Sequence, residues 1–92
     1  MAYEWDEDKN RLNIAQHGIA FTEADRFEWG RAVFEIDDRE DYDELREVAT
    51  GFLGDVLHVI VFTERGPDII RIISLRKATK REQKIYADNH QI

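Results

Sequence analysis

The stretch VLHVIVFTERGPDIIRIISLRKATKRE, residues 56–82, carries the strongest structural signals in the chain. Two runs rich in β-branched residues, VLHVIVFT at 56–63 and DIIRIISLR at 68–76, flank Arg65-Gly66-Pro67. The stretch therefore predicts two strands joined by a short turn. The first run lacks polar alternation except at His58, which predicts a central strand covered on both faces.

The end of this stretch is both helical and basic. Thr79 is followed by Glu82 three residues later, and this capping box predicts a last helix at about 80–89. Residues 69–82 contain one acid, Glu82, and five basic residues, which are Arg71, Arg76, Lys77, Lys80 and Arg81. The sequence thus predicts a cationic segment that runs from a strand into a helix.

Two further strands are predicted upstream, in RAVFEID at 31–37 and LREVATGFL at 45–53, with the acidic run DDREDYDE (37–44) between them. Gly54-Asp55 predicts a two-residue hairpin. Its register pairs Leu53 with Val56, Val48 with Val61 and Arg46 with Thr63. Because the four strands have short connections, we expect an antiparallel meander.

The N-terminal part predicts two helices. Asp6 can cap a helix at about 7–17 that ends at Gly18. Thr22 can cap a short second helix at about 23–29, which ends at Gly30. The predicted fold is therefore α+β, with two N-terminal helices, a four-stranded antiparallel meander and a C-terminal helix.

Composition limits the class of protein. The chain has 92 residues, 42% of them apolar, and no cysteine, which predicts a single folded domain over 1–92 without a disulfide scaffold. Neither a secretory signal pattern nor an apolar run of ~20 residues is found, so we expect a cytoplasmic protein. Residues 1–50 have a net charge of −9 and residues 51–92 a net charge of +2. This balance disfavours diffuse nucleic-acid binding but leaves room for a local cationic face.

Two separated blocks, EWDEDKNRLNIAQHGIAF at 4–21 and FTERGPDIIRIISLRKATKREQKIY at 62–86, resemble the signature blocks of the BrnT-type toxins of bacterial toxin-antitoxin pairs. The resemblance implies a RelE-like fold and an endoribonuclease that stops translation without a cofactor. It also implies a cognate antitoxin with a ribbon-helix-helix DNA-binding domain, so that DNA is contacted only through the antitoxin.

RNA cleavage without a metal needs a base for the 2′-hydroxyl, an acid for the leaving 5′-oxygen, and cations around the phosphorane. Arginine suits the last role because its planar fork grips phosphate and stays charged. Histidine suits proton transfer because it titrates near neutrality. The predicted catalytic residues are His17, Arg46, Arg71 and Arg76. The predicted RNA-binding residues are Arg65, Lys77, Lys80 and Arg81. No metal site is predicted, since the chain has no cysteine or histidine cluster and no EF-hand loop.

The position of Arg71 depends on the preceding turn. With a three-residue loop, Arg71 falls opposite Val61, on the same face as Arg46 and Thr63. A two-residue turn would place it on the other face. A charge inside an apolar strand must in either case reach an open face or a partner.

Each functional interpretation of these residues has a structural alternative. The basic side chains can be merely solvated or paired with the acidic half of the chain. His17 can simply favour the C-terminal end of its helix, and His58 is better explained by packing than by catalysis. Asn10 and Asn13, poor helix formers, are expected to hold a loop or the sheet edge in place.

The acidic run is either a solvated loop or a surface for a basic arm of the antitoxin. Two functions therefore remain open from the sequence. One is a ribonuclease toxin, and the other is a non-catalytic binding module that acts with its antitoxin as an autorepressor complex.

Overall fold

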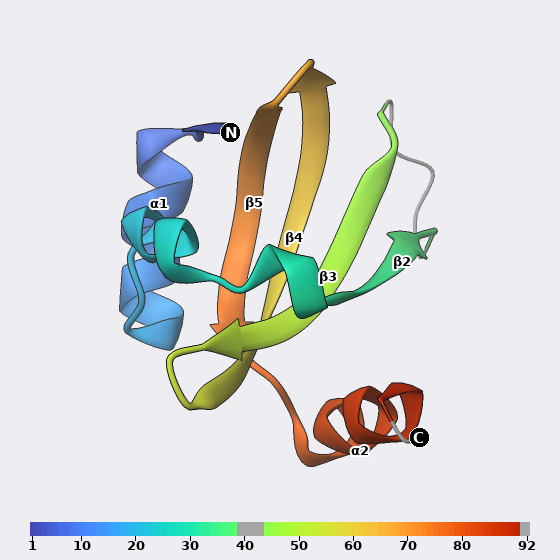
Figure 1. The fold of residues 1–92 in the computed structure, drawn as a ribbon. Coiled ribbons are helices and arrows are strands. Elements are labelled where there is room, and N and C mark those ends of the chain that lie inside the picture. Colours follow the sequence, from blue (N-terminus) through green and yellow to red (C-terminus); the bar gives the residue numbers. More distant parts are fainter. Residues whose placement is uncertain (39–43, 91–92) are drawn as a thin grey trace.

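The computed structural model describes residues 1–38 and 44–90, which form a five-stranded sheet with flanking helices (Figure 1). In chain order the elements are β1 (Ala2–Glu4), α1 (Glu7–His17), the 3₁₀ helices η1 (Phe21–Arg26) and η2 (Trp29–Arg31), β2 (Val33–Asp37), β3 (Arg46–Leu53), β4 (Val56–Gly66), β5 (Ile69–Lys77) and α2 (Lys80–Asn89). No helix among the described residues is long and apolar enough to cross a membrane.

Helix α1 has the predicted bounds and caps. The carboxylate of Asp6 accepts a hydrogen bond from the Asp8 backbone N–H at 2.8 Å. Gly18 ends the helix in the left-handed conformation, with φ of 72°, which glycine adopts without steric cost. These short-range signals were sufficient because they act within one turn of the helix.

Two buried asparagines of α1 hold other parts of the chain, as expected from the sequence. Asn13 donates to the Leu75 carbonyl at 2.8 Å and accepts from the Leu75 N–H at 3.1 Å. Asn10 accepts from the backbone N–H of Phe21 at 2.8 Å. The Asn13 side chain therefore hydrogen-bonds the β5 backbone at Leu75, beyond the residues of β5 that pair with β1.

The predicted second α-helix at 23–29 is wrong, because the chain forms the two short 3₁₀ helices η1 and η2 instead. Phe21, Ala24 and Phe27 are all buried. Their spacing of three matches the three residues per turn of a 3₁₀ helix rather than the 3.6 of an α-helix. Burial of this triplet explains the tighter winding.

The predicted antiparallel meander is correct for β2 to β5 but incomplete. The sheet order is β1-β5-β4-β3-β2, with β1 parallel to β5 from Ala2–Ile69 to Glu4–Arg71. The sheet is therefore mixed and five-stranded. Strand β1 has only three residues, too few for a periodic pattern to be recognised.

The β3–β4 hairpin confirms the predicted pairs Leu53–Val56 and Val48–Val61. The regular register ends at Glu47–Phe62, so the predicted Arg46–Thr63 pair lies just beyond it. Strand β4 lies between β3 and β5, which confirms that it is central.

The β4–β5 hairpin contains a bulge that the sequence did not predict. Val61 is opposite Ser74 but Phe62 is opposite Ile72, so Ile73 is the extra residue. A second irregularity lies at Arg65, because Gly66 is opposite Ile69 but Glu64 is opposite Ile70. Arg71 lies opposite Thr63 and not opposite Val61, the partner expected for a three-residue loop. Thr63 and Val61 are two residues apart on β4, so Arg71 is on the face expected for that loop length and not on the one expected for a two-residue turn.

Strand alternation gives the sheet two different faces. One face, which we call the core face, carries Ile60, Ile72 and Leu75, each at most 1% exposed. These residues pack with Phe21 and Ala24 of η1 in one hydrophobic cluster. Helix α2 packs on the opposite face through Tyr86, and its ring meets Phe52 edge-on at 5.5 Å.

Candidate functional site

Three predicted arginines lie on the side of the sheet opposite the core face. Arg71 is opposite Thr63 and Arg76 is opposite Val59 in the β4–β5 ladder. Directly opposed residues of an antiparallel pair project on the same side. Val48 of β3 is opposite Val61 of β4, and Arg46 is two residues before Val48, so Arg46 projects on that side as well. We call this side the arginine face.

Carboxylates hold two of these arginines in place. Arg71 Nη1 donates to Glu4 Oε2 at 2.9 Å. Arg76 forms a bidentate pair with Glu82, in which Nη1 and Nη2 donate at 2.8 and 2.9 Å. The Arg71 and Arg76 side chains remain 35% and 32% exposed, so an incoming anion can reach them. Arg46 Nε lies 3.8 Å from Glu44 Oε1.

Glu82 connects β5 to α2. It accepts from the Thr79 backbone N–H at 2.8 Å, and Thr79 Oγ1 accepts from the Glu82 N–H at 3.2 Å. This confirms the predicted capping box. Hydrogen bonding to Arg76 is the main cause that lowers the pKa of Glu82 to about 2, which keeps this carboxylate ionised at neutral pH. The ion pair therefore fixes the start of α2 relative to Arg76.

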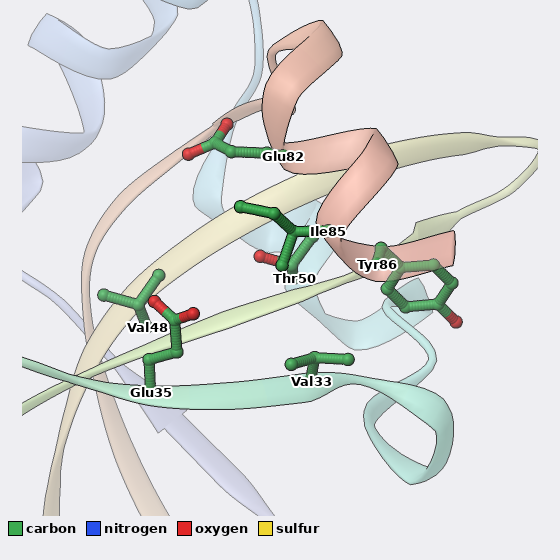
Figure 2. A pocket seen from close by; sticks show the side chains of 7 residues that line it. All are labelled: Val33, Glu35, Val48, Thr50, Glu82, Ile85 and Tyr86. Carbon is green, nitrogen blue, oxygen red and sulfur yellow. The ribbon is translucent and has the colours of Figure 1, made fainter. Parts of the chain in front are cut away.

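Two neighbouring cavities lie between α2 and strands β2 and β3. The first, which we call the apolar slot, has a volume of about 60 Å³ and is lined mainly by aliphatic and aromatic side chains. Figure 2 shows Val33 and Glu35 projecting from β2 toward Ile85 of α2. The complete lining of the slot is Val33, Glu35, Val48, Thr50, Glu82, Ile85 and Tyr86.

The second cavity, which we call the acidic cavity, has a volume of about 230 Å³ and includes Arg76. Its lining is Glu35, Ile36, Asp37, Asp38, Val48, Val61, Arg76 and Glu82. It shares Glu35, Val48 and Glu82 with the apolar slot. We call these two neighbouring cavities beside α2 together the α2 groove.

His17 lies outside the α2 groove. It is exposed at the end of α1 and lines a different cavity of about 230 Å³, together with Lys9, Leu12, Asn13, Gln16, Ile73 and Ser74. Ser74 stands between Arg71 and Arg76 along β5. The structure therefore brings His17 to the β5 edge, beside the strand that carries both arginines, but not into the groove with Arg76.

The predicted RNA-binding residues are not gathered at one place. Lys77 is opposite His58 in the ladder and so projects from the core-face side of the sheet. Arg65 is exposed near the β4–β5 turn, and Lys80 and Arg81 are exposed on the first turn of α2. Lys77, Lys80 and Arg81 are close in sequence to the Arg76–Glu82 pair, but Lys77 projects from the other face of the sheet.

His58 is a structural residue, as the sequence favoured. It is 5% exposed, and its Nδ1 lies 2.8 Å from the carbonyl oxygen of Val56. Packing and this hydrogen bond account for its presence in an apolar strand.

The sequence did not predict a pair of glutamates that share a proton. A hydrogen bond with Glu64, followed by burial and the Glu64 charge, raises the pKa of Glu47 to about 7. Glu47 is opposite Phe62, so this pair lies on the core-face side and not among the arginines. No local pattern connects these two residues, because they are on different strands.

The carboxylate partners Glu4 and Glu82 were also missed as site residues. Glu82 was recognised only for its capping role, and Glu4 needs β1 to reach Arg71. Among residues 1–38 and 44–90, no three His, Asp or Glu groups form a cluster that could hold a metal ion. The centre of the acidic run, residues 39–43, lies outside the described residues, so the two readings of that run stay predictions.

Comparisons with known proteins agree on one family. Residues 5–82 match the model of the ribonuclease toxin, BrnT, of type II toxin-antitoxin systems. The structure is similar to the 1.1 Å crystal structure of the Brucella abortus ribonuclease toxin, BrnT, with a TM-score of 0.65 and 25% sequence identity over 87% of this chain and 100% of the other. A search of curated protein sequences gave no significant match.

Proposed function

This chain belongs to the BrnT family of ribonuclease toxins of type II toxin-antitoxin systems, and from this premise we propose that it is an endoribonuclease that inhibits translation by cleaving RNA. The observation that carries the proposal is the placement of Arg46, Arg71 and Arg76 on one face of the sheet. A cluster of guanidinium groups meets the main electrostatic demand of phosphodiester cleavage, which is the negative charge that develops on the phosphorane.

The proposed reaction is attack of the ribose 2′-oxygen on the adjacent phosphorus. The bond from phosphorus to the 5′-oxygen breaks, the 2′-hydroxyl proton goes to a base, and the 5′-oxygen takes a proton from an acid. The products are a 2′,3′-cyclic phosphate and a free 5′-hydroxyl. Arg71 and Arg76 are assigned to the phosphate oxygens, because charge-assisted pairs with Glu4 and Glu82 hold both guanidinium groups in position.

His17 is the proposed proton-transfer group, since an exposed imidazole can both accept and donate a proton. Its cavity includes Ser74 on β5. RNA that contacts Arg71 or Arg76 would therefore have to cross the β5 edge to meet His17. Exposed Lys80 and Arg81 at the start of α2 are assigned to more distant phosphates of the same strand.

We also propose that cleavage is independent of metal ions, because arginines supply the cationic charge of the mechanism. Incubation of the purified protein with RNA in EDTA tests this directly. Product ends carrying a 2′,3′-cyclic or 3′-phosphate are expected. Activity that is lost in EDTA and restored by magnesium would contradict this mechanism.

The proposed partner is an antitoxin with a ribbon-helix-helix domain, which neutralises the toxin and links it to DNA. We propose that the toxin and the antitoxin both act in the cytoplasm. Because a partner that binds only the folded state raises stability by mass action, the melting temperature of the toxin is expected to rise in a saturated complex. An unchanged melting temperature would count against a complex of this kind.

One observation favours the second candidate function, a non-catalytic module that acts within a DNA-binding complex of toxin and antitoxin. Arg71 and Arg76 each already have a carboxylate partner within 3 Å, which lowers the positive potential offered to RNA. The same incubation in EDTA distinguishes the candidates, since a binding module would leave RNA intact while still binding its antitoxin.

A further inference from the structure

We propose that the α2 groove is the docking site for a segment of the antitoxin that inserts a Lys or Arg side chain into the acidic cavity and an aliphatic side chain into the apolar slot. This inference rests on the proposed function, because it assigns the surface through which the toxin is neutralised. It predicts that the antitoxin acts by filling the space next to Arg76.

The charge of the acidic cavity selects a cationic occupant. Its lining includes Glu35, Asp37, Asp38 and Glu82, of which Asp37 is 6% exposed and lies opposite Arg46 in the β2–β3 ladder. Glu35 and Asp38 are exposed. The guanidinium group in that lining is Arg76, and it is already engaged by Glu82 at 2.8 and 2.9 Å. The exposed carboxylates of Glu35 and Asp38 would attract a Lys or Arg side chain of a protein partner to the space beside Arg76.

The apolar slot selects the second contact. Val33 and Val48 from the sheet and Ile85 and Tyr86 from α2 surround it, and Figure 2 shows Val33 and Ile85 on opposite sides of the space. Ile85 is 39% exposed, so covering it with an aliphatic side chain removes apolar surface from water. Nucleic acid has no aliphatic side chain to offer at such a site, which again favours a protein segment.

The adjacency of the two cavities sets the spacing of the partner residues. Glu35, Val48 and Glu82 line both cavities, so the basic and the aliphatic side chain must be close neighbours on the docked segment. Since Arg76 lines the acidic cavity, a segment seated there would exclude RNA from that arginine. Occupation of the groove therefore accounts for neutralisation without any change in the fold.

Glu35 is the residue on which to test the groove. It is exposed, it lines both cavities, and it is not assigned to catalysis. The dissociation constant for the antitoxin encoded by the adjacent gene is to be measured by calorimetry with wild type, Glu35→Lys, Glu35→Gln and Asp25→Lys. Asp25→Lys makes the same charge change as Glu35→Lys on η1, which packs on the core face. Melting curves of each variant establish that it is folded.

We expect Glu35→Lys to weaken antitoxin binding about tenfold or more, because it places a cation against the docked basic side chain. Glu35→Gln should have a smaller effect, and Asp25→Lys should stay within about twofold of wild type. Replacing Ile85 with Ser should also weaken binding, through the apolar slot alone. An affinity for the antitoxin that Glu35→Lys leaves unchanged would overturn the proposal.

Two other occupants give different results. If Glu35→Lys changed the affinity for a labelled single-stranded RNA but not for the antitoxin, the groove would belong to RNA. If the isolated toxin self-associated and Glu35→Lys abolished this without weakening antitoxin binding, the occupant would be a second copy of the chain. Either result overturns the proposal.

The cleavage assay separates this inference from the proposed function. Wild-type protein that fails to cleave RNA, yet shows the expected series of antitoxin affinities, supports the groove and contradicts the endoribonuclease. Wild-type protein that cleaves RNA while all variants bind the antitoxin equally contradicts the groove alone.

Discussion

On strand β5 the two faces of the sheet carry side chains of different kinds. On the core face, Ile60, Ile72 and Leu75 are at most 1% exposed and pack against η1. On the arginine face, Arg71 and Arg76 stand on the same strand as Leu75 but are held by carboxylates at the molecular surface. Alternation along one strand thus separates the residues that stabilise the fold from those assigned to chemistry.

The comparison teaches which contacts contribute to stability. Burial of an aliphatic side chain contributes several times more than an exposed ion pair, which is typically worth ~0–1 kcal/mol. The ion pairs of the arginine face therefore serve mainly to position guanidinium groups. Substitutions on the two faces should separate stability from activity.

The largest expected effect is on the core face. Leu75→Ala removes a fully buried side chain and should lower the free energy of unfolding by about 2–5 kcal/mol. The measurement is urea denaturation at neutral pH. Val48→Ala, a half-buried position on the arginine face, is the control and should lose much less. Equal losses would show that the two faces contribute similarly to stability.

The next effect is catalytic and concerns the arginine face. Arg71→Ala and Arg76→Ala should each reduce the rate of RNA cleavage about a hundredfold, equivalent to ~3 kcal/mol of transition-state stabilisation, by analogy with loss of an oxyanion-hole donor. Both variants should remain folded and should still bind the antitoxin, which melting curves and calorimetry measure. Lys84→Ala is the matched control, because Lys84 is exposed on α2 and pairs with Asp88 at 3.5 Å. Similar small losses in all three variants would identify the segment as a basic surface only.

A smaller effect concerns the connection between the arginine face and α2. The folded-state pKa of Glu82 is lowered to about 2 from its usual 4.5, so ionised Glu82 stabilises the fold above pH 4.5, and this contribution is lost as the pH falls toward 2. Glu82→Gln should therefore be less stable than wild type by about 1 kcal/mol at pH 7, since the pair is partly solvated. Denaturation from pH 7 down to pH 2 should show the two proteins converging. A constant difference would rule out the ion pair as its cause.

The smallest effect is expected from the glutamate pair on the core-face side. The folded-state pKa of Glu47 is about 7, above its usual 4.5, so protonated Glu47 stabilises the fold below pH 4.5, and this contribution is lost as the pH rises through 7. Glu47→Gln should be more stable than wild type at pH 8, by less than about 1 kcal/mol because the site is partly exposed. At pH 4 it should be no more stable than wild type. Melting temperatures at the two pH values measure this. A gain of equal size at both would contradict a shared proton.

Much of the site could be predicted because it follows from one strand. The alternation of Arg71 and Arg76 with apolar residues in 69–77 was visible in the sequence, and the shared face with Arg46 followed from one of the two loop lengths considered. The partner of Arg71 was missed because the β4–β5 register is irregular on both sides of Arg71, at Arg65 and at Ile73. The α2 groove was not predictable, since its lining comes from β2, β3, β4, β5 and α2.

The sequence by itself determined α1, the β3–β4 hairpin and the capped start of α2. Each of these depends on a cap or turn residue acting within a few positions, such as Asp6, Gly18 or the pair Thr79 and Glu82. Only the tertiary structure decided the strand β1, the 3₁₀ winding at 21–26 and the pairing of Arg71 with Glu4, 67 residues away. Such contacts depend on which distant segments the collapsed core brings together, and their energy is gained only after the chain between them has folded.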